Sequence, residues 1–218
     1  MIHVQYGCGH SAPNGWLNFD ASVTLRVERV PVVGRLVKKN SRRLPHGVAF
    51  GDIDKGLPVS DGSAVGVYAS HVLEHLSRAS VPIALQNTYR ILRPNGVFRL
   101  IVPDLEARAR RYIADLESAQ PDANDRLLRS SYLGVEADSE GLLGLASELF
   151  GRNKHLWMWD FPGIAAALAA AGFTSIRRCE MGDSGDPAFA AVEQRERFFD
   201  EPTGICELAV HCQRPANP

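Results

Sequence analysis

Two glycines and an aspartate near the start of the chain have the spacing of a nucleoside-binding site. Gly7, Cys8 and Gly9 follow an apolar run that predicts a strand over 2–6. Glycine is needed where a strand turns sharply and a ligand approaches the backbone, because a Cβ would be in the way. Asp20 ends the next apolar run, where a carboxylate can accept hydrogen bonds from both hydroxyls of a ribose. The plain alternatives are a tight turn and a helix cap.

The spacing between the glycines and the aspartate separates two kinds of nucleoside ligand. Ten residues lie between Gly9 and Asp20, which leaves no room for a full helix and a strand. A dinucleotide such as NAD needs that helix, because its N-terminus faces the pyrophosphate. S-adenosylmethionine has no phosphate. The spacing therefore favours S-adenosylmethionine, with an NAD-dependent oxidoreductase as an alternative.

His71, Glu74 and His75 are candidates for acid–base or metal chemistry. Their His-x-x-Glu-His pattern occurs in zinc peptidases, where the two imidazoles share one face of a helix. Here His71 directly follows an apolar run, so we expect it at a strand–helix turn. The sequence therefore predicts no metal, with Glu74 and His75 bracing the turn and His71 acting as a base or orienting group. A divalent ion held by Glu74 and His75 is an open alternative.

His155 stands close to two tryptophans in the segment 153–160. An imidazole has its ordinary pKa near neutrality, so it can take the proton of an attacking hydroxyl. Trp157 and Trp159 offer flat faces to an acceptor, although packing is the more frequent role of tryptophan. We therefore expect His155 to be the leading candidate for a general base, ahead of His71. A surface histidine beside core tryptophans is the alternative.

Alternating strand and helix patterns must position these residues. Apolar runs predict strands over residues 2–6, 16–19, 48–50, 65–69, 97–102, 175–178 and 205–211. Periodic patterns predict helices over 105–116 and 161–171, and a helix carrying Val81, Leu85, Tyr89 and Leu92 on one face that stops at Pro94. Strands separated by helices imply an α/β fold with a parallel sheet and ligands at the carboxyl ends of its strands.

Two segments interrupt this alternation in what we expect to be one domain over 1–218. The ranges 21–47 and 119–156 are predicted to be insertions that cover the carboxyl edge of the sheet. The first is basic, with seven lysines and arginines against one acid over 26–43. That pattern predicts a solvated flank of a lid or attraction to an anionic membrane surface. The net charge of -1 argues against nucleic-acid binding.

The cysteines and the first residues predict a cytoplasmic protein. The four cysteines show no Cys-x-x-Cys spacing. Cys206 and Cys212 would lie roughly 20 Å apart on one strand, too far for a disulfide. The chain begins with a strand pattern instead of a basic and apolar leader. Through 26–43, contact with the inner face of the membrane is an alternative location.

Six short motifs resemble the class I methyltransferases, in particular small bacterial members of the methyltransferase type 11 family. They are Gly-Cys-Gly at 7–9, Gly-Trp-Leu-Asn-Phe-Asp at 15–20, Gly-Asp-Ile at 51–53, Ser-His-Val-Leu-Glu-His at 70–75, Arg-Ile-Leu-Arg-Pro-Asn-Gly at 90–96, and Ala-Gly-Phe at 171–173 after His155. The resemblance spans 4–180 and 205–213. It implies a Rossmann-like doubly wound sheet of seven mostly parallel strands, with an antiparallel last strand over 205–213.

The same resemblance implies S-adenosylmethionine as cofactor and a set of residues that hold it. The loop 7–9 would line the methionine moiety, and the aspartate that ends the next strand would hold the ribose. Asp52 would take the adenine amine while Ile53 packs on the ring. Ser70 and His71 would lie by the sulfonium.

The reaction implied is methyl transfer to a small-molecule or saccharide acceptor, with oxygen slightly favoured over nitrogen. Such an in-line displacement needs mainly alignment and the exclusion of water. A base is needed for a hydroxyl or a protonated amine. Gly66, where the family usually has aspartate, and a first strand with no helix before it leave a rival: an inactive cofactor-binding or assembly partner of the same fold.

Overall fold

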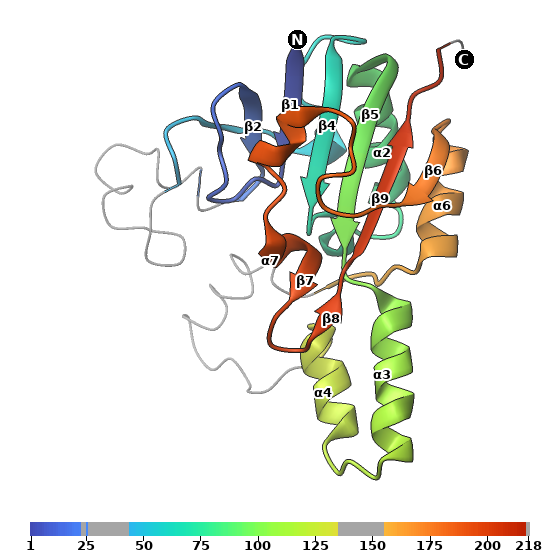
Figure 1. Cartoon of the computed structure of the whole chain (residues 1–218). Helices are drawn as coiled ribbons and strands as arrows, with labels where there is room; N and C mark the ends of the chain where they lie inside the picture. The colour runs from blue at the N-terminus through green and yellow to red at the C-terminus, as the bar shows by residue number, and fades with distance from the viewer. Residues whose placement is uncertain (23–24, 26–43, 135–154, 217–218) are drawn as a thin grey trace.

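The computed structural model describes residues 1–22, 25, 44–134 and 155–216 (Figure 1). Its main sheet has seven strands in the order β3-β2-β1-β4-β5-β9-β6. Their bounds are β1 (Ile2–Tyr6), β2 (Trp16–Asp20), β3 (Val48–Phe50), β4 (Ala64–Ser70), β5 (Leu92–Val102), β6 (Thr174–Arg178) and β9 (Leu208–Gln213). The strands β7 (Phe199–Asp200) and β8 (Ile205–Cys206) pair separately.

Strand direction confirms the predicted fold. The pairs β3–β2, β2–β1, β1–β4 and β4–β5 are parallel, whereas β9 runs antiparallel to both β5 and β6. The run expected as one strand over 205–213 is divided at Glu207, which lies between the end of β8 at Cys206 and the start of β9 at Leu208. The division has a physical reason, because the carboxylate of Glu207 binds the buried guanidinium of Arg108.

Five α-helices and three short 3-10 helices are described. They are α2 (Ser80–Ile91), α3 (Leu105–Glu117), α4 (Ala123–Ser130), α6 (Phe161–Ala170) and α7 (Arg195–Phe198), with η2 (Ile53–Lys55), η3 (Leu73–His75) and η4 (Pro187–Ala191). Helices α3 and α4 project beyond the carboxyl edge of the sheet (Figure 1). Helix α4 lies in the predicted insertion 119–156. Residues 135–154 of that insertion lie outside the described part of the chain.

Helix α2 ends at Ile91, so the prediction that it continues to the turn at Pro94 was wrong. The amide of Leu92 still donates to the carbonyl of Thr88, but Leu92 already pairs with Ala64 of β4. A residue that precedes proline is restricted to extended backbone. The strand β5 therefore begins before the proline, five residues earlier than its apolar run suggests.

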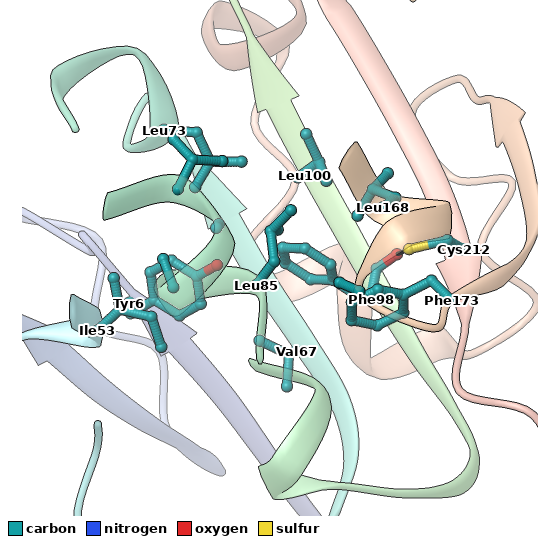
Figure 2. Close-up of a cluster of buried hydrophobic side chains, with 14 of the residues drawn as sticks. Tyr6, Ile53, Val67, Leu73, Leu85, Phe98, Leu100, Leu168, Phe173 and Cys212 are labelled. Carbon is teal, nitrogen blue, oxygen red and sulfur yellow. Dashed lines mark hydrogen bonds between the residues drawn. The ribbon is translucent and has the colours of Figure 1, made fainter. Parts of the chain in front are cut away.

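An apolar layer fills the face of the sheet that α2 and α6 cover. Figure 2 shows Tyr6, Val67 and Phe98 of the strands meeting Leu85 of α2 and Leu168 of α6. These side chains are buried to within 1% of complete burial. Because side chains alternate along a strand, the intervening residues of β1, β4 and β5 face the other side of the sheet.

The opposite face is covered by the segment between β6 and α7, which crosses in front of β1, β4 and β5 (Figure 1). Phe189 of η4 is fully buried and packs against Trp16, Tyr68 and Ile101 of the strands. A Cβ on Gly66 would lie 2.8 Å from the His3 ring and 3.0 Å from that of Phe189. Gly66 is therefore accounted for by packing under this segment, four residues before the end of β4.

A buried arginine holds this covering segment on the sheet. The Arg99 side chain is 1% exposed, and its Nε donates to Glu193 Oε1 at 2.5 Å. Its two terminal nitrogens donate to Asp183 Oδ1 and to the carbonyl of Glu180, each at 2.7 Å. Glu193 also accepts a hydrogen bond from the amide of Gly182 at 2.7 Å. One guanidinium thus binds the segment at three points, which favours its close fit to the strands.

One sequence prediction concerns a basic segment that the structure does not describe. Most of the insertion 21–47, with the whole basic segment 26–43, lies outside the described residues, so its attraction to a membrane surface stays a prediction. Within the described ranges, no helix has the length and apolar character needed to cross a membrane.

Replacing Arg99 by leucine is expected to lower the free energy of unfolding by about 3–5 kcal/mol, because the Glu193 carboxylate stays buried without its partner. Urea unfolding followed by circular dichroism measures the change. Arg177→Leu is the matched control, since Arg177 pairs with the same Asp183 from a side chain that is 46% exposed. It should cost at most about 1 kcal/mol. Equal losses in the two variants would contradict the role given to Arg99.

Candidate functional site

A cavity of about 380 Å³ opens at the carboxyl ends of β1, β2 and β4. Strand order reverses between β1 and β4, and such a switch point is where open α/β sheets bind ligands. We call this space the first cavity. Seven of the eight residues predicted to hold the cofactor line it: Gly7, Gly9, Asp20, Asp52, Ile53, Ser70 and His71.

The two glycines of the loop are required for different reasons. Both have left-handed backbone, with φ of 65° at Gly7 and 54° at Gly9. A Cβ on Gly7 would lie 2.2 Å from Val72 Cγ2, whereas one on Gly9 would have no atom within 4 Å. Gly7 therefore lets β1 approach the turn after β4, and Gly9 leaves open space beside the cavity.

Cys8, the eighth predicted residue, points away from the first cavity. Its side chain is fully buried and packs with Leu25, Leu44 and Val48. Its amide donates to the carbonyl of Phe19 at 3.1 Å. The structure therefore places the Cys8 backbone within the loop and its thiol in the core beyond β2.

Asp20 ties the glycine loop to the end of β2. Its side chain is buried, and its Oδ2 accepts a hydrogen bond from the Gly9 amide at 2.9 Å. Its Oδ1 accepts from the amide of Ser22 at 2.8 Å. These two contacts hold the carboxylate at the wall of the first cavity. Asp20 thus shapes the loop and lines the space beside it.

Asp52 and Ile53 form the far wall of the first cavity. Asp52 caps η2, accepting from the Asp54 amide, and pairs with Lys55 Nζ at 2.9 Å. Ile53 is 4% exposed, and its carbonyl accepts from Asn87 Nδ2 of α2 at 2.7 Å. The wall is therefore fixed to α2, with one carboxylate and one apolar side chain at the cavity.

His71 directly follows β4 and lines the first cavity at the end of that strand. It has a left-handed backbone with φ of 54°, and its amide donates to the carbonyl of Ile101 at 2.9 Å. Its Nδ1 lies 3.2 Å from Glu74 Oε1, and its Nε2 lies 3.3 Å from the carbonyl of Arg197. Burial lowers the pKa of His71, but the hydrogen bond and charge of Glu74 outweigh it and raise the pKa overall. Two acceptors around one ring favour the protonated imidazole.

A second cavity, of about 470 Å³, adjoins the first and shares His71 and His75 with it. It lies between η3, the β7–β8 hairpin and the end of the second insertion. Carboxylates dominate its wall against one arginine, Arg108; they are Glu74, Glu196, Asp200, Glu201 and Glu207. The two cavities are therefore separated by histidines at the end of β4.

His155 lines the second cavity and not the first. It is 9% exposed, with ring centroids 5.1 Å from His75 and 4.9 Å from Tyr132. Burial lowers the pKa of His155 to about 4, so its imidazole is neutral at pH 7. The two residues after it are fixed to η3, because the amides of Leu156 and Trp157 donate to the carbonyl of Glu74 at 2.7 and 3.1 Å.

The tryptophans that follow His155 lie outside both cavity walls. Trp159 is 2% exposed and belongs to the core, as the packing alternative predicted. Trp157 is 44% exposed and, like Trp159, lies near the Arg78 guanidinium, at 5.7 Å. Neither tryptophan lines the space beside His155, so stacking on an acceptor there has no geometric basis.

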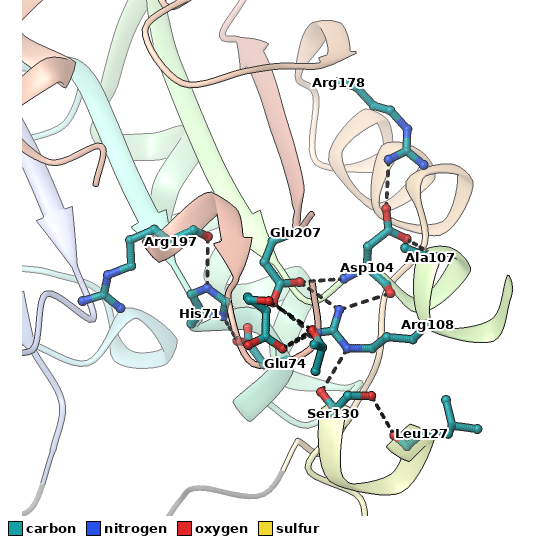
Figure 3. A network of polar contacts seen from close by, with 12 residues as sticks. His71, Glu74, Asp104, Ala107, Arg108, Leu127, Ser130, Arg178, Arg197 and Glu207 are labelled. Atoms are coloured by element: carbon teal, nitrogen blue, oxygen red, sulfur yellow. Dashed lines mark hydrogen bonds and ion pairs between the residues drawn. The ribbon is translucent and has the colours of Figure 1, made fainter. Parts of the chain in front are cut away.

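A buried ion pair missed by the sequence analysis forms the floor of the second cavity (Figure 3). Arg108 of α3 is 2% exposed and donates to both oxygens of Glu207, at 2.8 and 2.9 Å. Its Nε also donates to the carbonyl of Ser130 at the end of α4. Arg108 looks like a solvent-facing residue of an amphipathic helix. The one signal in the sequence is Glu207, an acid inside an apolar strand pattern.

Residues 4–100 match the model of a methyltransferase domain family, type 11. Over these residues the chain is similar to methyltransferase domains. The match covers 97 of the 218 residues, and together with the fold it supports the resemblance drawn from the six motifs. No curated protein sequence matches the chain.

Solved structures share the fold at low sequence identity. An S-adenosylmethionine-dependent methyltransferase from Archaeoglobus fulgidus is 12% identical with a TM-score of 0.51, over 97% of this chain and 85% of that one. One from Methanosarcina mazei is 13% identical with a TM-score of 0.51, over 98% and 92%. The CurJ carbon methyltransferase is 14% identical with a TM-score of 0.49, over 99% of this chain, and the present chain spans 48% of the CurJ chain.

The two loop glycines allow a direct test of the site geometry. Gly9→Ala should cost about 1–2 kcal/mol of unfolding free energy, from left-handed backbone strain alone. Gly7→Ala should cost about 1–3 kcal/mol more, because its Cβ would displace Val72. Adding Val72→Ala should recover part of the loss in the Gly7→Ala background and none in the Gly9→Ala background. Urea unfolding of the four variants measures this, and equal costs for the two glycines would rule out the close approach.

Proposed function

We propose that the first cavity binds S-adenosylmethionine and the second binds the methyl acceptor. The observation that carries the proposal is that the two cavities meet at His71 and His75. S-adenosylmethionine supplies a methyl group already activated on a sulfonium. The protein's task is then to align an acceptor at the shared wall and to exclude water.

The residues around the first cavity fit a nucleoside with an amino-acid tail. Asp20 lines the cavity, where its carboxylate can accept hydrogen bonds from the two ribose hydroxyls, and Asp52 offers a carboxylate for the adenine amine. Ile53 supplies the apolar surface for the ring. The open side of Gly9 gives the methionine portion room beside the backbone. Ser70 and His71 then lie at the sulfonium end, where β4 stops.

For the acceptor we propose a small molecule or saccharide, with an oxygen methylated in preference to a nitrogen. Carboxylates around the second cavity accept hydrogen bonds from the hydroxyls of a sugar. His155 is neutral at pH 7, so its ring can accept a hydrogen bond from an acceptor hydroxyl, although the burial that lowers its pKa to about 4 makes it a weaker base than an ordinary imidazole. His71 is held as a proton donor by Glu74 and Arg197, which suits an orienting role better than that of a base.

The same carboxylates make an ammonium-bearing acceptor the second candidate. Five acids and one arginine line the second cavity, and an excess of one charge attracts the opposite charge. Methylation at nitrogen would then require the amine to lose its proton first, a task that again falls to His155.

Adenosylhomocysteine should stabilise the folded chain, because a ligand that binds the native state alone shifts unfolding by mass action. At a hundred times its dissociation constant the gain is about 2.7 kcal/mol, which corresponds to a rise in melting temperature of about 5–10 °C for a chain of this size. Differential scanning fluorimetry measures it. NADH is the control and should have no effect; a rise with NADH but none with adenosylhomocysteine would overturn the proposed ligand.

Asp20→Ala should weaken adenosylhomocysteine binding by about 1.5–3 kcal/mol, the usual contribution of hydrogen bonds to a charged group. Isothermal titration calorimetry on variant protein with native near-ultraviolet dichroism gives the affinity. Asp61→Ala is the control, since the Asp61 side chain is 70% exposed and pairs with Arg90 outside the cavity. Unchanged affinity in folded Asp20→Ala would leave Asp20 with the loop-bracing role alone.

A further inference from the structure

We propose that Glu74, His75 and His155 form a binding site for one divalent transition-metal ion at the wall of the second cavity. They offer one carboxylate oxygen and two imidazole nitrogens, and one such atom from each lies within 4.8 Å of the others. Metal bonds of about 2.0–2.1 Å allow two donors on one ion to be at most about 4.2 Å apart. The three side chains therefore need to close by less than about 1 Å.

Two of these side chains carry buried atoms that an ion would satisfy. Glu74 is 0% exposed and His155 is 9% exposed. Among the residues that the structure describes, Glu74 Oε2 and His155 Nδ1 have no hydrogen-bond partner. A buried polar atom in that state costs about 1–3 kcal/mol, and more when it is charged. Native proteins leave few such atoms, and a bound ion is one of the usual reasons.

The backbone holds the two halves of this site together without the ion. His155 lies 81 residues after Glu74 in the sequence, yet the amides of Leu156 and Trp157 both donate to the Glu74 carbonyl. The carbonyl of Trp159 accepts in turn from the amide of Leu105, at 2.8 Å. The loop that carries His155 is thus fixed over η3, so the donors are arranged before any ion binds.

The surrounding charges favour a cation. Glu74 Oε1 lies 3.2 Å from His71 Nδ1 and 3.9 Å from His75 Nε2, so the Glu74 carboxylate already faces one of the proposed donors. The cavity wall holds five carboxylates against Arg108, and Arg108 is already paired with Glu207. A divalent ion at Glu74 would reduce this excess of negative charge where it is most deeply buried.

The donor set selects the class of ion. Two imidazoles and one carboxylate suit zinc, iron, manganese or cobalt, whereas magnesium and calcium prefer oxygen donors alone. Three protein donors leave coordination positions free for water or an acceptor hydroxyl, whose pKa the ion would lower. In that case the ion, and not His155, would activate the hydroxyl. Ion binding itself does not depend on the proposed methyl transfer and can be measured without cofactor or acceptor.

This site differs from the His-x-x-Glu-His reading of the sequence. That pattern pairs His71 with His75, whereas His71 is engaged by Glu74 and by the carbonyl of Arg197. The sequence predicted no metal because His71 was expected at a strand–helix turn, and the structure does place His71 directly after β4. The alternative left open there, a divalent ion held by Glu74 and His75, contains two of the three donors proposed here. The third donor found here, His155, comes from a distant part of the chain, and spacing along the sequence carries no sign of it.

Titration of the full chain with cobalt(II) after removal of metals by EDTA tests the proposal. We expect one ion per chain and the visible d–d absorption of cobalt bound to nitrogen and oxygen donors, with zinc displacing cobalt and magnesium failing to do so. Glu74→Gln and His155→Ala should each weaken binding at least about tenfold. Circular dichroism establishes whether each variant is folded. If Glu74→Gln does not fold, the cobalt affinity of His155→Ala alone decides the test.

Two further variants make the test specific. His46→Ala, an exposed histidine outside the cluster, should bind cobalt like the unaltered chain. His71→Asn, which tolerates the left-handed backbone, should still bind one ion. Loss of the ion in His71→Asn but not in His155→Ala would assign the metal to the His-x-x-Glu-His set and overturn this site. Absence of stoichiometric cobalt or zinc binding to the unaltered chain would overturn it as well.

Discussion

The buried carboxylate of Glu74 is the interaction on which the arrangement of the whole site depends. Its side chain engages His71 at the end of β4, and its carbonyl accepts two amides from the loop after His155. An acid with no solvent exposure cannot give up such contacts without a large desolvation cost. Glu74 therefore fixes, from one position, both the near wall of the first cavity and the loop that lines the second.

The two faces of the main sheet are covered by different kinds of contact. One face is closed by helices α2 and α6 with apolar side chains, which tolerate exchange of volume. The other is closed by the segment after β6, which Arg99 holds through Glu193, Asp183 and a carbonyl. Arg108 of α3 has a similar role at the carboxyl edge of the sheet. It binds Glu207, the residue before β9, and the carbonyl of Ser130 at the end of α4. Buried guanidinium groups thus fix the segments that pack on the sheet where no long helix covers it.

Local chemistry made much of the first cavity predictable, because a glycine loop and the acid that follows it act through neighbouring strand ends. The fold followed from the alternation of strands and helices. Contacts made across the sheet could not be predicted in this way. Arg108 has the spacing of an exposed helix residue, and Cys8, in the turn after β1, points its thiol into the core. Helix α2 ends where Leu92 pairs with β4. Nothing local in the sequence links His155 to Glu74.

The left-handed backbone at His71 places stability and activity in opposition at one position. A non-glycine residue with φ of 54° carries conformational strain of about 1–2 kcal/mol, which glycine would relieve. A selection for thermal robustness alone would therefore drift toward glycine here, and it would lose the ring that separates the two cavities. The chain keeps this strained residue at the junction, where the ring contacts Glu74 and the carbonyl of Arg197, two contacts that a glycine could not make.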